Sequence, residues 1–229
     1  MNMKLFDLAG ADPERRFSPY CWPIRMAIAH KRLDVETIPW RFMDKDAIAS
    51  SGQGKVPVLV HGDKWMFESW DIAIYLEKTF PDRPTLFGGP EGVALSKFFA
   101  NLASVIASQV VRLVLVDIYD HLTESDKPYF RESREQRFGM ALEQVVAQRD
   151  SLLQPFRDSL LPLRMTLRSQ KFLGGDHPLY ADYAVFGVFQ WSRCISPFQL
   201  LAEDDPVAQW RKRLLEAFDG LAQSAPGYD

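Results

Sequence analysis

The chain has 229 residues, which exceeds the usual single-domain size of about 100 to 150 residues. Hydrophobic residues make up 47% of it and charged residues 25%, a composition that supports a sizeable core and argues against a disordered, collagen-like or disulfide-scaffold protein. The 27 Lys and Arg residues against 30 Asp and Glu give a net charge of -3, so the chain as a whole has no electrostatic signature of nucleic-acid binding. We therefore expect two compact domains, or one large one, and no nucleic-acid partner.

The sequence predicts neither secretion nor membrane insertion. Residues 1–16 contain no apolar signal-peptide core and no cleavage site. The most apolar long stretch, residues 98–118, is interrupted by polar side chains that a membrane-spanning helix tolerates poorly: Asn101, Gln109, Arg112 and Asp117. We expect a cytoplasmic location and no membrane contact.

The cysteines and histidines are too scattered to predict a metal site or a catalytic triad. Cys21 and Cys194 lie far apart and lack a metal-ligand spacing, which suits a reducing cytosol where thiols stay free. The histidines are equally dispersed, at His30, His61, His121 and His177. We expect no metal in this protein.

Up to about residue 80, short apolar runs alternate with helical segments, which indicates a mixed α/β domain. The expected order is a strand over residues 3–8, a helix over 18–32 and a strand over 35–40. Two short strands follow within residues 56–67, on either side of the turn signal at 61–63, and a helix opens at residues 68 and 69.

From residue 93 onward the apolar spacing is helical, with no convincing strand. A segment rich in Pro and Gly, residues 81–92, is expected to link this part to the first, which gives domains over residues 1–80 and 93–229. The expected helices cover residues 95–113, 129–153, a segment ending near 167, then 182–191 and 207–218. The sequence thus predicts an α/β domain followed by an all-α domain.

Ser18 stands directly before Pro19 at the start of the expected first helix. Ser is a common N-cap residue and Pro a common first helical residue, so a plain helix cap accounts for the pair. The same geometry places a hydroxyl and free amides at a helix N-terminus, where they can stabilise an anion such as a thiolate. Position alone permits catalysis without proving it.

Cys21 completes the sequence Ser-Pro-Tyr-Cys, where a redox dithiol site would have Cys-x-x-Cys. Without the first cysteine no dithiol can form, so we interpret Cys21 as a packed small side chain rather than a reactive thiol. Pro23 predicts an irregular or kinked first turn, because its ring removes a backbone donor and clashes with the preceding turn.

Three further segments bear on ligand binding. Residues 52–55 (GQGK) lack too many features of a phosphate loop to predict one. Pro57 stands at the start of a strand, and a cis bond there would expose the backbone of Val56 to an extended ligand. Glu68 and Ser69 offer a carboxylate and a hydroxyl at a helix start; they suit a ligand with an ammonium and a carboxylate, and a plain cap also explains them.

Taken together, these motifs resemble the cytosolic glutathione transferase family. The resemblance rests on FSPYC after the first strand, KVPVL at the third and ESWDIAIYLE after the fourth, and it extends to FLGGDHPLYADYAVFG in the helical half. It implies a thioredoxin-like N-terminal domain that binds glutathione and an all-α C-terminal domain that completes a pocket for an electrophile. It also implies a homodimer.

The resemblance further implies roles for individual residues. Ser18 would hydrogen-bond the glutathione sulfur and favour its thiolate, and Val56, before a cis Pro57, would pair through its backbone with the cysteinyl part. The remaining residues are expected at the two ends of the tripeptide: Glu68 and Ser69 at the γ-glutamyl end, and Lys45 or, as a second candidate, Lys55 at the glycyl carboxylate.

Within the family, the chain looks most like a group that contains the bacterial lignin β-aryl etherases and fungal serine-type relatives. The segments FSPYCW, SGQGKVPVLVHGD, FPDRPTLFGG, YFRESREQRFG and YADY carry this likeness. It implies that the glutathione thiolate displaces an aryloxide from a carbon next to a ketone. Tyr20, Trp22 and residues of the helix over 98–113 would line an aromatic electrophile pocket.

Two departures from the family pattern matter. Leu179 occupies a position where a Ser or Thr would cap the helix that contains Asp182, so we expect a different local cap there. Ser18 in place of a cysteine argues for conjugation or substitution chemistry rather than thiol transfer. The alternative function is a noncatalytic ligand carrier or regulatory binding protein of the same fold.

Overall fold

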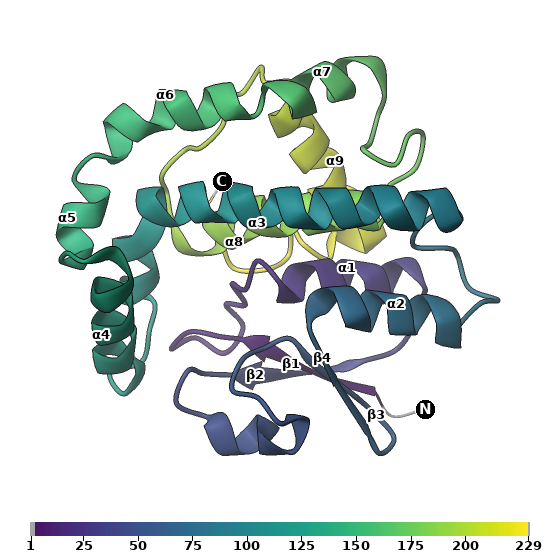
Figure 1. Ribbon diagram of the computed structural model, residues 1–229, viewed down its shortest axis with the longest axis horizontal. Helices are drawn as coiled ribbons and strands as arrows, with labels where there is room; N and C mark the ends of the chain where they lie inside the picture. The colour runs from purple at the N-terminus through teal and green to yellow at the C-terminus, as the bar shows by residue number, and fades with distance from the viewer. Residues whose placement is uncertain (1–2, 229) are drawn as a thin grey trace.

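A mixed four-stranded sheet forms the lower layer of the computed structural model, which describes residues 3–228 (Figure 1). Its strands are β1 (Met3–Leu8), β2 (Glu36–Trp40), β3 (Val58–His61) and β4 (Lys64–Phe67), in the order β2-β1-β3-β4. β1 pairs parallel with β2 and antiparallel with β3, and β3 and β4 form a hairpin. The apolar run of β1 suits its central place, because a central strand is covered on both faces. The strand predicted over residues 3–8 is confirmed.

Three helical elements belong to this first part: α1 (Cys21–His30), the short 3-10 helix η1 (Lys45–Ser51) and α2 (Ser69–Thr79). α1 and α2 lie between the sheet and the helical part of the chain, so they connect the two layers (Figure 1). η1 was not predicted from the sequence, since its few apolar residues show no helical repeat.

α1 begins at Cys21, three residues later than predicted, and runs unbroken to His30. Pro23 is therefore the third residue of the helix. The first N–H groups of a helix have no intrahelical acceptor, so the missing donor of Pro23 removes no helical hydrogen bond. The predicted kink is wrong for this reason, and the irregular backbone lies before the helix, at residues 18–20.

The rest of the chain is helical. Its elements are α3 (Pro90–Asp120), α4 (Asp126–Phe138), α5 (Leu142–Val146), α6 (Arg149–Ser159), α7 (Leu161–Ser169), α8 (Tyr180–Ile195) and α9 (Pro206–Gly220). Every residue of α8 is buried, which identifies it as the central helix. It packs against both α3 and α1, so the core of the helical part continues into the first part.

The single helix predicted over residues 129–153 is wrong, because the chain divides there into α4, α5 and α6. Gly139 follows α4 with a φ of 69°, a left-handed conformation that favours glycine and ends the helix. Ala141 is then extended, with a ψ of 148°. Apolar spacing continued across this break, which is why the sequence pattern suggested one helix.

α3 begins at Pro90, inside the segment 81–92 that the sequence assigns to a linker. By length and composition alone, α3 could cross a membrane. It packs against α8, α5 and α6, and residues such as Val110, Leu113 and Val114 are buried in the bundle. These contacts are those of a core helix.

The start of α8 is fixed by the carboxylate of Asp182. It accepts hydrogen bonds from the backbone N–H groups of Leu173, Gly174 and Leu179 and from Nε1 of Trp210, at 2.7 to 3.0 Å. Leu179 has no side-chain acceptor, so it cannot accept a hydrogen bond from the backbone N–H of Asp182 as a Ser or Thr would in a capping box. The local cap therefore differs, as expected. Asp182 satisfies the N-cap amide and also attaches the preceding loop and α9 to the central helix.

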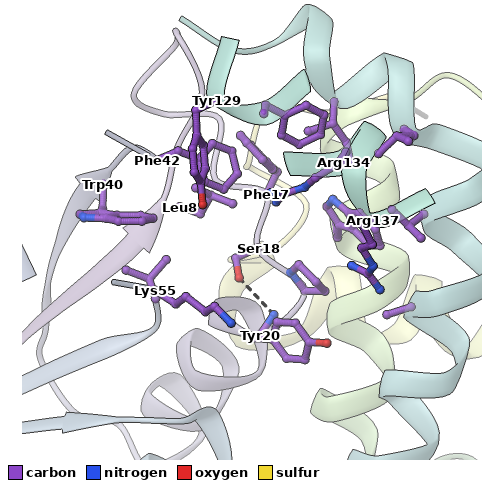
Figure 2. A pocket seen from close by; sticks show the side chains of 18 of the residues that line it. Leu8, Phe17, Ser18, Tyr20, Trp40, Phe42, Lys55, Tyr129, Arg134 and Arg137 are labelled. Atoms are coloured by element: carbon purple, nitrogen blue, oxygen red, sulfur yellow. Dashed lines mark hydrogen bonds between the residues drawn. The ribbon is translucent and has the colours of Figure 1, made fainter. Parts of the chain in front are cut away.

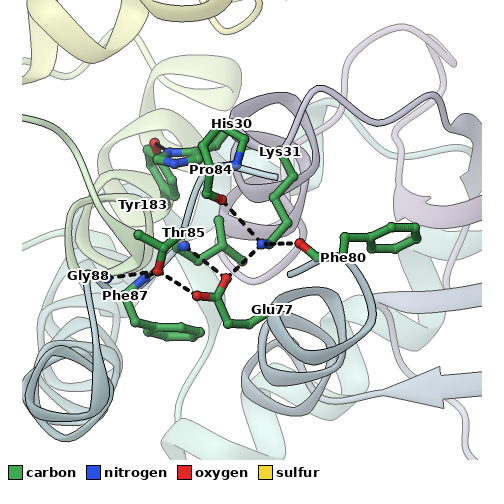
Figure 3. Close-up of polar contacts among 10 residues, drawn as sticks. His30, Lys31, Glu77, Phe80, Pro84, Thr85, Phe87, Gly88 and Tyr183 are labelled. Atoms are coloured by element: carbon green, nitrogen blue, oxygen red, sulfur yellow. Dashed lines mark hydrogen bonds and ion pairs between the residues drawn. The ribbon is translucent and has the colours of Figure 1, made fainter. Parts of the chain in front are cut away.

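A buried ion pair ties the end of α1 to α2 and to the segment before α3 (Figure 3). Nζ of the fully buried Lys31 lies 2.7 Å from a carboxylate oxygen of Glu77 and donates to the carbonyls of Phe80 and Pro84, each at 3.2 Å. The same carboxylate accepts the N–H of Leu86. Burial acts to raise the pKa of Glu77, but the donors from Leu86 and Lys31 outweigh it, so the pKa lies below its usual value.

We predict that Glu77→Gln lowers the free energy of unfolding at pH 7 by about 2 to 3 kcal/mol, because it leaves the buried Lys31 ammonium without its counterion. Because the pKa of Glu77 is lower in the folded protein, its ionised carboxylate stabilises the fold fully above the pKa of Glu in the unfolded chain. This stabilisation is lost as the pH falls through the lower pKa of the folded protein. The deficit of the variant should therefore shrink below about pH 4.

Urea unfolding of both proteins between pH 3 and pH 8 measures this difference. Glu36→Gln is the matched control, since Glu36 forms only an exposed pair with Lys4 and its loss should change stability little. An equal deficit at every pH would contradict the assignment of a charged Glu77.

Candidate functional site

A hydroxyl at the start of α1 is held between two backbone amides. Oγ of Ser18 accepts a hydrogen bond from the N–H of Tyr20 at 3.2 Å (Figure 2) and a second one from the N–H of Cys21 at 3.1 Å. Ser18 is 3% exposed, and its side chain also interacts with the thiol of Cys21 beside it. Since the two amides occupy its lone pairs, the hydroxyl can donate its proton to a ligand in place of that thiol. The residue caps the turn and also has the geometry to hydrogen-bond an anion.

The turn that carries Ser18 packs directly on α8 at Gly187. A Cβ atom at position 187 would lie 2.5 Å from the carbonyl oxygen of Pro19 and 2.7 Å from Cδ of Pro23. Only glycine therefore allows this close approach of the turn to the central helix. On the other side, Nε1 of Trp22 donates to the carbonyl of Arg16 at 2.9 Å, which fixes the chain entering the turn.

Ser18 opens onto a cavity of about 290 Å³ between the two parts of the chain (Figure 2). The first part contributes an apolar and aromatic side that includes Leu8, Phe17, Trp40 and Phe42. The helical part contributes residues from three helices: Ser104, Ala107, Ser108, Val111, Leu115 and Ile118 from α3, Tyr129, Phe130, Arg134 and Arg137 from α4, and Trp191 from α8. The cavity suits a small aromatic molecule with polar groups.

A second cavity, of about 160 Å³, shares Pro19, Tyr20 and Ser104 with the first. Glu68 and Ser69 line it, together with α3 residues such as Lys97 and Asn101. The shared residues make the two cavities adjacent, on either side of Tyr20. An extended ligand can therefore pass the Ser18 turn with its ends in chemically different surroundings.

Glu68 and Ser69 occupy the start of α2. Glu68 is exposed and has a φ of 61° and a ψ of 119°, a conformation that non-glycine residues rarely adopt. The hydroxyl of the buried Tyr180 donates to the carbonyl of Ser69 at 3.0 Å, which fixes this end of α2 to α8. Neither side chain caps α2, so both are available to a ligand.

The first cavity is also lined by Lys45, Lys55 and Val56. Val56 precedes a cis bond to Pro57, as predicted, and stands outside the β3–β4 ladder, which starts at Val58. Its backbone groups are thus not used in the sheet. Nζ of Lys45 donates to the carbonyl of Gly54 at 2.9 Å and lies 5.2 Å from the ring centre of Tyr129. The buried Pro57 is not part of the cavity wall.

Trp22, predicted to line the electrophile pocket, lies instead in the core and is fully buried. Helical geometry turns position 22 inward from the turn, whereas Tyr20 is 45% exposed and borders both cavities. Cys21 is also fully buried. Burial raises the pKa of its thiol well above the usual value, and the charge of Asp7 adds to this rise, so Cys21 is a packed, protonated thiol.

Four cavity residues were not predicted from the sequence: Phe42, Tyr129, Arg134 and Arg137. The last two lie three residues apart on α4. Spacing of three residues places two cations on the same helix face, but the sequence does not show that this face meets the cavity. Burial lowers the pKa of the Arg134 guanidinium, an effect that Tyr129 partly offsets.

Within residues 3–228, no group of three or more His, Cys, Asp or Glu side chains could hold a metal ion. What the site offers is a hydrogen-bond donor at a helix N-terminus, an apolar cavity beside it and charged residues around both. This arrangement can bind and orient an anionic nucleophile next to an apolar partner.

Two domain families match the chain. A model of the glutathione S-transferase C-terminal domain matches residues 94–218, and a model of the glutathione S-transferase N-terminal domain matches residues 13–84. The second match covers the Ser18 turn and the start of α2, and the first covers α3, α4 and α8.

Relatives of known sequence are distant. A probable glutathione S-transferase, parA, of Nicotiana tabacum is 23% identical over 219 residues, which cover 90% of this chain and 86% of the relative. Glutathione S-transferase 1 of Dianthus caryophyllus is 28% identical over 112 residues, or 47% of this chain. The match spans about half the length of the Dianthus protein and of a glutathione S-transferase-like protein, ustS, of Aspergillus flavus (49% and 50%).

Solved structures show the same fold. Glutathione transferase GSTFuA3 from Phanerochaete chrysosporium superposes with a TM-score of 0.84 at 21% identity, over 93% of this chain and 96% of that one. A glutathione S-transferase of Ceriporiopsis subvermispora, solved in complex with glutathione, gives 0.84 at 23% identity over 98% of both chains. Together with the domain matches, they confirm the predicted fold class: a thioredoxin-like N-terminal domain with a small mixed sheet, followed by an all-helical domain.

We predict that Gly187→Ala displaces the Ser18 turn. Alanine favours a helix interior by about 1 kcal/mol over glycine, so the substitution would stabilise α8 if no steric clash arose. Because the new methyl group would meet the Pro19 carbonyl and the Pro23 ring, we expect a lower melting temperature and a loss of turnover of about tenfold or more. Thermal unfolding and steady-state kinetics measure both effects; a stabilised variant with full activity would contradict the packing described.

Proposed function

The chain belongs to the glutathione S-transferase family, and we propose that it is an active transferase in which Ser18 stabilises the glutathione thiolate for attack on a small apolar or aromatic electrophile. The observation that carries this proposal is the Ser18 hydroxyl, held by the amides of Tyr20 and Cys21 at the edge of an apolar cavity. Family membership alone does not establish catalysis.

In this proposal glutathione lies across the two adjacent cavities. Its ammonium and α-carboxylate meet Glu68 and Ser69, and the cysteinyl part pairs with the free backbone groups of Val56 before Pro57. The glycyl carboxylate is held by Lys45 or Lys55. The relatives solved with glutathione or with glutathione sulfonate support this choice of cosubstrate.

Ser18 would act by donating its hydroxyl proton in a hydrogen bond to the sulfur. A hydrogen bond to a charged group contributes about 1.5 to 3 kcal/mol, which corresponds to a thiol pKa lower by about one to two units. The positive end of α1 acts in the same direction. A larger thiolate fraction near pH 7 then supplies the nucleophile, while the thiol proton leaves to solvent.

The reaction forms a carbon–sulfur bond and breaks the bond from that carbon to the leaving group, which departs with the electron pair. With an aryl halide the leaving group is halide. With an ether at a carbon next to a ketone it is an aryloxide that takes a proton from water, the β-aryl ether cleavage implied by the sequence likeness. The aromatic side of the cavity, with Trp40, Phe42 and Tyr129, accommodates an aryl group in either case.

The domain boundaries at residues 80 and 93, a cytoplasmic location and the homodimer belong to the same proposal. For the dimer, the support is a stripe of exposed apolar side chains on α3, Leu95, Phe98 and Val105, which are 52%, 61% and 54% exposed. Such a stripe on one helix is typical of an interface. The alternative function is a noncatalytic ligand carrier or regulatory binding protein, which would bind glutathione at the same site without turnover.

We predict that Ser18→Ala lowers kcat about 10- to 100-fold, with little change in the KM for glutathione, because the lost hydrogen bond is made to the sulfur and not to the ends of the tripeptide. Ser18→Thr is the matched control, since it keeps a hydroxyl and should keep most of the activity. Steady-state kinetics with an α-aryloxy ketone and a chlorodinitrobenzene, each with a glutathione-free control, measures this.

The same assay separates the candidate functions. Phenol release that requires glutathione supports ether cleavage, and conjugation of the aryl halide alone supports a general transferase. Binding of glutathione without turnover of either compound favours the carrier. Undiminished activity in Ser18→Ala would contradict the role of Ser18.

We predict that Phe98→Glu converts a dimer into a monomer, because it places a charge in the centre of the exposed α3 stripe. Light scattering after size exclusion measures the mass. Met165→Glu is the matched control, since Met165 is equally exposed on α7, away from that stripe, and should leave the mass unchanged. A wild-type protein that is monomeric at micromolar concentration would contradict the dimer.

A further inference from the structure

The charged residues around the first cavity are all cations. Lys45, Lys55, Arg134 and Arg137 line it, and no Asp or Glu does so among the described residues. On the basis of the function proposed above, we propose that the electrophile is an anionic aromatic compound, with a carboxylate or a similar planar anion held by Arg134 and Arg137.

The cations come from both domains, and Lys45 reaches the ring of Tyr129 on α4. Lys45 and Lys55 belong to the N-terminal domain, near Val56, where they can meet the glycyl carboxylate of glutathione. Arg134 and Arg137 extend from α4 in the helical domain, across Ser18 from Lys55 (Figure 2). In the proposal the arginines hold the second substrate, because they line the wall that the helical domain contributes.

Neither arginine of the cavity is neutralised within the protein. Arg131, on the same helix, forms ion pairs with Glu135 and Glu143. Among the residues that the structure describes, Arg134 and Arg137 form no ion pair with a carboxylate. Arg134 instead bonds the Ser133 hydroxyl at 2.8 Å. An arginine stays charged under all ordinary conditions, so this region of the cavity has an uncompensated positive potential.

The side chains around Arg134 indicate that the rest of the ligand is aromatic. Its guanidinium carbon lies 4.7 Å from the ring centre of Phe130 and 5.3 Å from that of Phe42. The aromatic residues orient the guanidinium plane, and the fork of N–H donors matches a carboxylate in two-point contact. A ring seated against Phe42 and Tyr129 would present an anionic substituent to α4 and its electrophilic carbon to Ser18.

The position of α4 is set by a contact between the domains. The backbone N–H of Met43 donates to the carboxylate of the buried Asp126, at 3.0 Å, next to the start of α4. This bond attaches the helix that carries the arginines to the loop that carries Phe42. The anion-binding side and the aromatic side of the cavity are thus held in one geometry.

The test compares two electrophiles of equal shape, 4-chloro-3,5-dinitrobenzoate and 4-chloro-3,5-dinitrobenzamide. Each kcat/KM is divided by the uncatalysed rate constant with glutathione, which removes the difference in intrinsic reactivity. We expect the wild-type protein to prefer the benzoate about tenfold or more, the effect of one charged hydrogen bond. Arg134→Gln and Arg137→Gln should each reduce this ratio, and the double variant should bring it near one.

The KM for glutathione should stay unchanged in these variants. This result distinguishes a site for the carboxylate of the electrophile from the site of the glycyl carboxylate of glutathione. Arg131→Gln is the control on the same helix and should keep the wild-type ratio. A wild-type ratio of one or less, or a ratio that the arginine variants leave unchanged, overturns the inference. A raised KM for glutathione without a change in the ratio would assign the arginines to the glycyl carboxylate and also overturns it.

Calorimetric binding of the two purified glutathione conjugates, with the carboxylate or the amide on the ring, repeats the comparison without turnover. Tighter binding of the carboxylate conjugate that is lost in the double arginine variant supports the inference even if catalysis is absent. In that case only the proposed transferase activity fails. Equal affinity for both conjugates overturns the anionic preference whatever the activity.

Discussion

The amides that open α1 need an acceptor, and the hydroxyl of Ser18 supplies it. Its bonds from Tyr20 and Cys21 fix the orientation of Oγ, so the remaining proton can serve a ligand. The burial of Ser18 matters because a hydrogen bond to an anion is stronger where water is scarce. Structural capping and ligand activation are therefore not competing interpretations of this residue, since the bonds that satisfy the helix also prepare the donor.

The site depends on contacts that cross between the domains. Gly187 lets α8 support the Ser18 turn, and Tyr180 of the same helix holds the start of α2. Lys31 and Glu77 attach the other ends of α1 and α2 to the segment that enters α3. Because both cavities have walls from each domain, a change in how the domains pack alters the distance between Ser18 and the electrophile wall. Positioning of that kind has large effects on reaction rates.

Much of the fold follows from the sequence, and the errors have specific causes. The strands were predictable from their apolar runs, and Ser18 and Glu68 became candidates from their places at helix starts, whereas Lys45 and Lys55 were implied only by the family resemblance. The break at Gly139 was hidden because apolar residues continue across it, and the inward turn of Trp22 depends on where α1 begins. Arg134 and Arg137 could not be assigned, because their approach to Phe42 depends on the packing of α4, which no local pattern encodes.

The most direct test of the account is the ionisation of bound glutathione. Thiolate absorbance of the enzyme–glutathione complex, titrated from pH 4 to pH 10, reports the pKa of the bound thiol without any electrophile. The account predicts a pKa about one to two units below that of free glutathione in the wild-type complex, and a return toward the free value in Ser18→Ala. An identical pKa in both complexes would contradict the claim that Ser18 stabilises the thiolate.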